Sequence, residues 1–363
     1  MTLRPIVANL VLLGGALGVA FLVLEVSLRL VYPPPARFIY PQEAYDFDPE
    51  LGHALRRGQT AFTHDRLVRI NALGVRGAEV TPRPAPGTVR VLALGDSQTF
   101  GNGLDLAQTW PKQLEQRLHA APGSRWEVVN AGVPGTDTWQ HEILLRRLVA
   151  AVHPHAVVLA LYVNDVVPNH DPRNAGGTTL TNTSGKYLVY LLKRSAVVTW
   201  TYHMLVPWYA RQVARGNSVE EAVLSGEDDT RAERGWRQVE TSLAQMKELC
   251  DSLGVEFLVA ILPRRDQVSG QHPGRAYNQR ARRITEAHRI EALDLLPSLS
   301  AEYGAHRDKL FIPWDGHNAA AANQVIAARI AEKLESLTAV RSAPAGSPAP
   351  PAGSAPQLHG SRR

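Results

Sequence analysis

Cysteine is nearly absent from this sequence. Cys250 is the single cysteine among 363 residues, which excludes a disulfide within the chain and a structural zinc site built on several cysteines. Neither charge dominates, because 39 Lys and Arg against 34 Asp and Glu give a net charge of only +5. So small an excess does not indicate a nucleic-acid-binding protein. With 44% hydrophobic and 20% charged residues, the composition also excludes a fully disordered chain.

Charged residues are missing from residues 5–24, a run of 20 rich in Leu, Val, Ala and Gly. At about 1.5 Å per residue, a helix of this length spans roughly 30 Å, the thickness of the hydrocarbon core of a bilayer. A cleaved signal peptide would have an apolar region of about 7–15 residues followed by a small-residue cleavage site, and no such site is clear here. We therefore expect residues 1–32 to form a transmembrane anchor, which three consecutive prolines at positions 33–35 end.

The rest of the chain divides by composition into three parts. Residues 33–87 are rich in Pro, Arg and Gly, with turn-forming residues at 71–77, and we expect an irregular lead-in and linker. Residues 88–340 carry the regular hydrophobic patterns of a folded domain. Residues 341–363 consist largely of Ala, Pro, Gly and Ser and are expected to be a disordered tail.

Short apolar runs alternate with segments of helical spacing throughout residues 88–340. The runs predict strands at 88–94, 126–129, 156–163, 255–262 and 292–295, and the spacing predicts helices at 106–119, 140–152, 232–253, 277–290 and 318–337. Strands that alternate with helices and are apolar throughout favour an α/β fold, with a parallel five-stranded sheet covered by helices on both faces.

A long insertion, residues 169–231, separates the third strand from the next helix. It begins polar and becomes apolar and aromatic, with Trp200 and Trp208 among its aromatic residues. Three roles remain open for it. It can pack as a small helical subdomain, shape a substrate site at the end of the strand, or face the membrane.

Side chains able to perform nucleophilic chemistry follow the first strand. Gly95, Asp96 and Ser97 lie where this strand leads into the first helix, and ligands of open parallel sheets bind beyond the carboxyl ends of the strands. A serine there can attack a carbonyl while nearby N–H groups receive the resulting oxyanion. The residues form neither a G-x-S-x-G nucleophile elbow nor a phosphate-binding loop.

Further candidates follow the second and third strands and precede the last helix. Gly132 can offer a backbone N–H and Asn164 a side-chain amide, so that with the N–H of Ser97 three oxyanion donors are expected at this rim. His317 is a candidate general base for Ser97, and Asp315 a candidate orienter of its imidazole.

In order and in position on the strands, these four blocks resemble those of the SGNH (GDSL-like) hydrolases. The resemblance extends over residues 88–337 and implies a flavodoxin-like three-layer α/β/α sandwich and ester chemistry. It further implies Ser97 as nucleophile, His317 as base, Asp315 as orienter, and Ser97, Gly132 and Asn164 as the oxyanion hole.

One departure from the commonest family pattern concerns the acid. Many members place it three residues before the histidine, where this chain has Trp314, whereas Asp315 stands two residues before. That spacing resembles the alginate O-acetyltransferase-like branch, although a backbone carbonyl is an alternative orienter. Residues 71–77 and the N-terminal run also look like membrane-attached members whose catalytic domain is extracytoplasmic, which is the periplasm in a Gram-negative bacterium.

The leading hypothesis is a membrane-anchored serine esterase that hydrolyses O-acyl, above all O-acetyl, groups on a carbohydrate or cell-envelope substrate. One alternative is an O-acetyltransferase of a cell-surface polysaccharide, partnered with a membrane acyl donor. Another is a non-catalytic binding or envelope-assembly protein on the same fold. Arg264 and Trp314 are candidate substrate-binding residues. No metal site, cofactor or nucleic-acid partner is expected.

Overall fold

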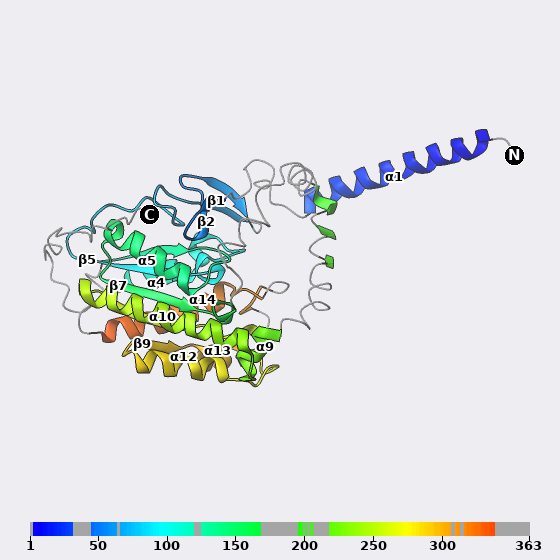
Figure 1. The fold of residues 1–363 in the computed structure, drawn as a ribbon. Coiled ribbons are helices and arrows are strands. Elements are labelled where there is room, and N and C mark those ends of the chain that lie inside the picture. Colours follow the sequence, from blue (N-terminus) through cyan, green and yellow to red (C-terminus); the bar gives the residue numbers. More distant parts are fainter. Residues whose placement is uncertain are drawn as a thin grey trace, which may run out of the picture.

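Five parallel strands form the central sheet (Figure 1). They are β5 (Thr88–Gly95), β6 (Arg125–Gly132), β7 (Ala156–Leu161), β8 (Glu256–Ile261) and β9 (Glu291–Asp294), and they lie in the order β6-β5-β7-β8-β9. This is the flavodoxin-like order, in which the chain changes direction between its first and third strands. The number of strands and their parallel pairing confirm the prediction, and every residue of β7 is buried, as its apolar run indicates.

The computed structural model describes residues 3–31, 45–63, 66–119, 125–167, 195–198, 200–201, 204–205, 218–305, 309–312 and 316–337. The expected disordered tail at 341–363 lies outside these residues, as does most of the insertion at 169–231.

Helices cover both faces of the sheet, which makes the three layers that the sequence predicts. One face carries α5 (Thr138–Val152), α10 (Thr230–Leu253) and α12 (Ala276–Ala287), and the other carries α4 (Trp110–His119), α13 (Leu296–Ala305) and α14 (Ala320–Ser336). Each face has its own core, with Leu145, Trp236 and Tyr277 in the first and Trp110 and Ile326 in the second.

The helix α10 illustrates how sequence sets these elements. Asp229 begins it by accepting hydrogen bonds from the backbone N–H groups of its first turn, and Gly254 ends it in the left-handed conformation. Between them Trp236, Leu243 and Cys250 belong to one buried stripe, at the spacing that places residues on one helix face. Burial raises the pKa of Cys250 to about 12, in keeping with an unreactive core residue.

Short elements in the loops are where the structure departs from the predicted pattern. The helix expected at 106–119 is divided at Thr109, because a 3-10 turn, η1 (Leu106–Gln108), precedes α4. In the described part of the chain, α9 (Ser218–Ser225), α11 (Arg265–Val268) and α13 lie outside the predicted helices. Two of them have eight residues or fewer, too few for a helical period to be read reliably from sequence.

The lead-in is the main correction to the predicted fold. Residues 45–69 were expected to be irregular but form two hairpins, β1 (Tyr45–Asp48) with β2 (Gly52–Leu55), and β3 (Thr60–Thr63) with β4 (Arg66–Arg69). The chain then returns to the sheet, where Arg76 makes an antiparallel bridge to Asn130 of β6. A strand of only four residues, stabilised by contacts with distant parts of the chain, shows little periodic pattern in the sequence. Composition alone therefore suggested a linker.

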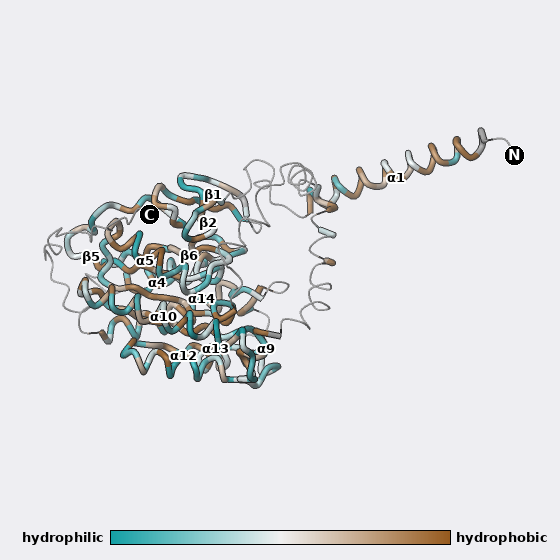
Figure 2. Tube along the Cα trace, viewed as in Figure 1, coloured by the Kyte–Doolittle hydropathy of each residue, from teal (hydrophilic) through white to brown (hydrophobic). Residues whose placement is uncertain are grey.

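At its N-terminus the chain forms one long helix, α1 (Leu3–Val31), which leads away from the sheet (Figure 1). Residues 6–31 contain an apolar stretch with a mean hydropathy of 2.4, and none of that stretch is buried. In Figure 2, most of the trace of α1 has the colours of hydrophobic residues. The helix is long and apolar enough to cross a membrane, a property that membrane anchors share with signal sequences.

Candidate active site

The loop after β5 presents Ser97. Gly95 ends the strand at φ +148°, and a Cβ added there would lie 2.2 Å from Thr99 Oγ1, so only glycine fits. Ser97 is the first residue of the short helix α3 (Ser97–Phe100), which Asp96 caps by accepting a 2.8 Å hydrogen bond from the Gln98 N–H. The backbone N–H groups that begin a helix have no acceptor within that helix, and Asp96 supplies one from outside it.

His317, the candidate general base, lies against Ser97. Its Nε2 is 2.8 Å from Ser97 Oγ, although 220 residues separate them along the chain. The loop that carries it turns at Gly316, which has φ +78°, and Ile312 N–H donates to the His317 carbonyl at 2.8 Å. A serine hydroxyl within hydrogen-bonding distance of an imidazole is the arrangement that nucleophilic catalysis by serine requires.

Two residues expected beside His317 cannot be placed. Asp315, the predicted orienter, and Trp314, a predicted substrate contact, lie outside the described residues, so both assignments stay predictions.

Asn164 approaches the same loop from the neighbouring strand. It belongs to η2 (Val163–Val166), directly after β7, so β5 and β7 bring Ser97 and Asn164 to the switch point of the sheet. Asn164 Nδ2 donates to Asp96 Oδ2 at 2.9 Å. Asp96 is completely buried, and burial raises its pKa above the ordinary range. The contact therefore ties the two loops together directly beneath Ser97.

Gly132, the third predicted oxyanion donor, ends β6 beside α3. In this structure its N–H donates to Asn130 Oδ1 at 3.1 Å. A Cβ at position 132 would lie 2.2 Å from the Phe100 nitrogen and 2.7 Å from the Thr99 carbonyl carbon. Close packing of two backbones therefore requires a glycine here, independently of any role in catalysis.

Two residues that support this site were not singled out from the sequence. Gln98 Oε1 accepts the Asn318 backbone N–H at 3.1 Å, which links the residue after Ser97 to the residue after His317. Arg76, only 3% exposed, donates to the carbonyls of Phe100, Gly101 and Leu104 at 2.6–2.9 Å. Gln98 offered no signal beyond its place beside Ser97, whereas an arginine between turn glycines is a visible feature of the lead-in.

Behind Asn164 lies a buried acidic group. Asp165 Oδ2 accepts the Tyr162 N–H at 2.8 Å, and its Oδ1 is 4.0 Å from His141 Nδ1. Burial raises the pKa of Asp165 well above its ordinary value and lowers the pKa of His141 to about 3. Both shifts favour uncharged side chains, as expected for ionisable groups without access to solvent.

The predicted substrate contact Arg264 is engaged by acidic side chains. Its guanidinium contacts Asp266 and donates to Glu221 at 2.7 Å and Glu220 at 3.4 Å. These ion pairs connect α11 with α9 and balance the charge of the arginine within the protein. Its role in substrate binding stays a prediction, beside this structural one.

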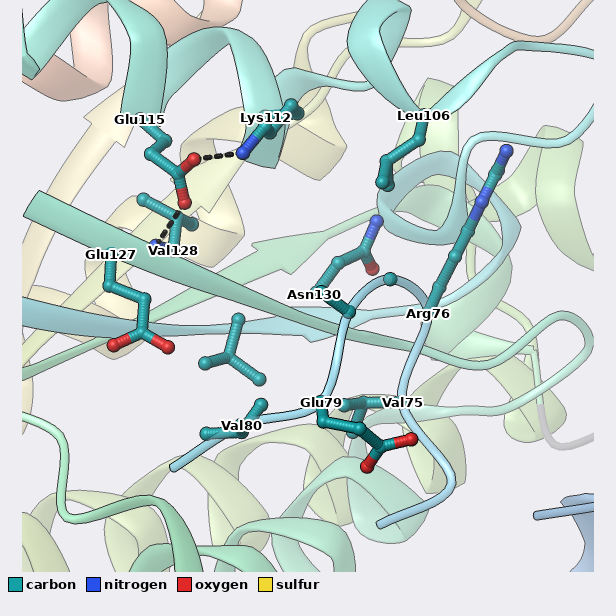
Figure 3. A pocket seen from close by; sticks show the side chains of 13 residues that line it. Val75, Arg76, Glu79, Val80, Leu106, Lys112, Glu115, Glu127, Val128 and Asn130 are labelled. Atoms are coloured by element: carbon teal, nitrogen blue, oxygen red, sulfur yellow. Dashed lines mark hydrogen bonds and ion pairs between the residues drawn. The ribbon is translucent and has the colours of Figure 1, made fainter. Parts of the chain in front are cut away.

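A cavity of about 260 Å³ opens at the edge strand β6, and neither Ser97 nor His317 lines it (Figure 3). Within it, Glu115 of α4 contacts Lys112 and accepts the Val128 N–H at 2.9 Å. A side chain that occupies an edge N–H protects the edge from pairing with another strand. The cavity therefore lies over a sheet edge that a side chain already protects. Across the described part of the chain, no group of three His, Cys, Asp or Glu side chains is arranged to hold a metal ion.

Comparisons with known proteins identify the family of this chain. Residues 93–325 match the GDSL-like Lipase/Acylhydrolase family, while a search of curated proteins finds no match. Similar solved structures include TesA (18% identity over 68% of this chain and 98% of that chain, TM-score 0.41). They also include the psychrotrophic esterase EstA from Pseudoalteromonas sp. (15% identity over 68% of this chain and 96% of that chain, TM-score 0.40). A further one is the acetyl xylan esterase AlAXEase (14% identity over 68% of this chain and 99% of that chain, TM-score 0.41). Because the family match covers more than half of the chain, this protein belongs to the GDSL-like lipase/acylhydrolase family and is a hydrolase of ester bonds.

Proposed function

We propose that this protein is a membrane-anchored serine esterase that removes O-acyl groups, O-acetyl above all, from a carbohydrate or cell-envelope substrate outside the cytoplasm. The observation that carries the proposal is the 2.8 Å contact between Ser97 Oγ and His317 Nε2 at the switch point of the sheet. The anchor rests on the length and hydropathy of α1. The acetyl group, the carbohydrate and the compartment rest on the resemblance of the sequence blocks to extracytoplasmic SGNH enzymes.

In the first half-reaction Ser97 Oγ attacks the ester carbonyl carbon while His317 Nε2 takes the hydroxyl proton. The carbonyl oxygen becomes an oxyanion, for which the Ser97 N–H and the second hydrogen of Asn164 Nδ2 are the proposed donors. The Gly132 N–H joins them by sharing the hydrogen that it now gives to Asn130 Oδ1. His317 then returns the proton to the leaving alcohol, and the acyl group stays on Ser97.

In the second half-reaction a water molecule gives a proton to His317 and attacks the acyl carbon. Collapse of the oxyanion releases the carboxylic acid and restores the Ser97 hydroxyl with the proton from His317. Asp315 is the proposed orienter of the imidazole in both steps. A sugar hydroxyl in place of water would make the same intermediate serve an O-acetyltransferase.

The test compares the full chain in detergent with its Ser97→Ala variant on p-nitrophenyl acetate and on an acetylated oligosaccharide. Loss of the nucleophile is expected to lower the rate at least ~10³-fold with unchanged thermal unfolding. Ser252→Ala is the matched control, since this serine hydroxyl is exposed and donates to the Leu249 carbonyl at 2.8 Å. Wild-type rates from Ser97→Ala would contradict the proposal. Acetate in solution indicates the esterase, whereas acetyl transfer to an added acceptor oligosaccharide indicates the transferase.

A further inference from the structure

An acidic residue of α1 contacts the insertion. Glu25 accepts hydrogen bonds from the Ala196 N–H at 2.9 Å, the Val197 N–H at 3.0 Å and the Ser195 hydroxyl at 2.7 Å. It is 8% exposed, while its neighbours Leu24 and Val26 are 45% and 49% exposed. Of the described α1 residues, Glu25 is therefore the one that the rest of the chain covers most completely.

The contact has the chemistry of a helix cap supplied by a distant part of the chain. Residues 196–198 are helical, and the N–H groups that begin a helix need acceptors from outside it. The Glu25 carboxylate provides one and also suits the positive end of the helix dipole. Arg29, one turn further along α1, donates to Glu25 at 2.6 Å and balances its charge.

The position of Glu25 along α1 defines its depth in a membrane. The 20 uncharged residues before it span roughly 30 Å, which is the full hydrocarbon thickness. Glu25 and Arg29 then stand where the helix leaves the hydrocarbon region. A carboxylate is costly inside a bilayer and tolerable at this boundary when it is paired. In a helix that spans the bilayer, a segment bound to Glu25 would lie at the level of the lipid headgroups.

Apolar side chains cover the exposed face of this segment. Trp200 is 39% exposed, Met204 60% and Leu205 55%, and each of the three has helical backbone. Figure 1 shows the segment leading away from the end of α1 at a steep angle to it, instead of continuing along it. Tryptophan beside an apolar surface is characteristic of the membrane–water boundary.

We infer that the described part of this segment, residues 195–198, 200–201 and 204–205, is a second membrane contact, seated in the headgroup region of a lipid bilayer and held there by Glu25. The occupant facing the exposed apolar side chains is the lipid surface, because Glu25 joins the segment to α1 at the point where the uncharged run of α1 ends. The inference rests on the membrane-anchor part of the proposed function and is independent of the ester chemistry. Two attachments would fix the catalytic domain against the membrane, where a single helix would leave it free to rotate.

The test places an environment-sensitive nitrobenzoxadiazole label on Met204→Cys in the full chain, reconstituted into phosphatidylcholine–phosphatidylglycerol vesicles that contain lipids with a nitroxide near the headgroup. Arg282→Cys is the control, because this side chain on α12 is 58% exposed. Cys250 is buried, and the wild-type chain corrects for any label that it takes up. The label at 204 is expected to shift its emission to the blue and to lose most of its intensity to the nitroxide, while the label at 282 does neither.

The variant Glu25→Gln tests the cap. The glutamine amide keeps the shape of the carboxylate but turns its own N–H group towards the backbone N–H groups of the segment. Loss of hydrogen bonds to a charged acceptor is expected to lower the ratio of membrane-seated to free segment about tenfold or more. Nitroxide quenching at 204 should fall accordingly, while hydrolysis of p-nitrophenyl acetate stays at the wild-type rate and reports an intact fold.

An unquenched label at 204 in vesicles that retain the chain would overturn the membrane contact, and equal quenching with and without Glu25→Gln would overturn the role of Glu25. A chain that does not float with vesicles would overturn the anchor and this inference with it. Failure of the esterase proposal would appear separately, as activity that survives Ser97→Ala.

Discussion

Replacing Gly132 with alanine should both destabilise the protein and impair catalysis, for a reason that can be measured on the structure. The added Cβ would lie 2.2 Å from the Phe100 nitrogen, whereas real Cβ atoms are essentially never found within 3.0 Å of another heavy atom. The obstruction is backbone, so rotation of a side chain cannot relieve it, and β6 and α3 must separate by about 1 Å. Overpacking of this kind costs about 1–3 kcal/mol or more. In a domain of this size that corresponds to a fall in Tm of roughly 2–12 °C.

The same shift moves the nucleophile, because Ser97 begins the helix that Phe100 ends. A displacement of about 1 Å can lower the rate of a positioned reaction by about 10²-fold. The assay pairs thermal unfolding followed by circular dichroism with hydrolysis of p-nitrophenyl acetate. Gly304→Ala is the control, since nothing lies within 4 Å of its added Cβ and it sits in α13, so it should leave both readouts unchanged or raise Tm slightly. A Gly132→Ala variant with wild-type Tm and rate would refute the steric reasoning, and a lowered Tm with a normal rate would refute its link to Ser97.

Three further outcomes are expected. Gln98→Met removes the acceptor of the Asn318 N–H and should lower kcat about 10–100-fold with little change in KM, so steady-state kinetics with an unchanged kcat would argue against its positioning of His317. Because burial raises the pKa of Asp165, the folded protein holds a proton that the unfolded chain releases above about pH 4, and stability is lost as pH rises towards the folded-state pKa. Asp165→Asn should therefore raise Tm more at pH 8 than at pH 5. Melting curves in which the variant raises Tm equally at both pH values would exclude Asp165 as a source of pH-dependent stability. Cys250, whose pKa is raised to about 12, should resist maleimide at pH 7 until guanidinium unfolds the chain, as mass spectrometry can verify.

Support for the nucleophile comes from three directions in the structure. From β6, Asn130 Nδ2 donates to the Thr99 carbonyl at 2.9 Å. From the lead-in, Arg76 donates to the carbonyls of Phe100 and Gly101 at the C-terminal end of α3. Gln98 joins α3 to the loop of His317. A four-residue helix has too few internal hydrogen bonds to hold its own geometry. Its position is therefore set by neighbours that precede and follow it in the sequence.

Much of the fold could be predicted because the parallel strands are buried on both faces. The apolar runs at 88–94 and 156–163 correspond closely to β5 and β7, and a strand buried on both sides has no polar alternation to obscure it. The site could be predicted for a related reason. Ser97 and Asn164 directly follow such strands, and the carboxyl ends of parallel strands meet at one edge of a sheet.

The sequence by itself determined the five-stranded sheet, the apolar span of α1 and the residue types available for ester chemistry, since each is written in local pattern and in order along the chain. Only the tertiary structure decided which residues support that chemistry. The contacts of Arg76 with Phe100 and of Gln98 with Asn318 join positions that are 24 and 220 residues apart. No periodicity encodes such pairs, because a hydrogen bond between distant segments depends on where folding places both ends.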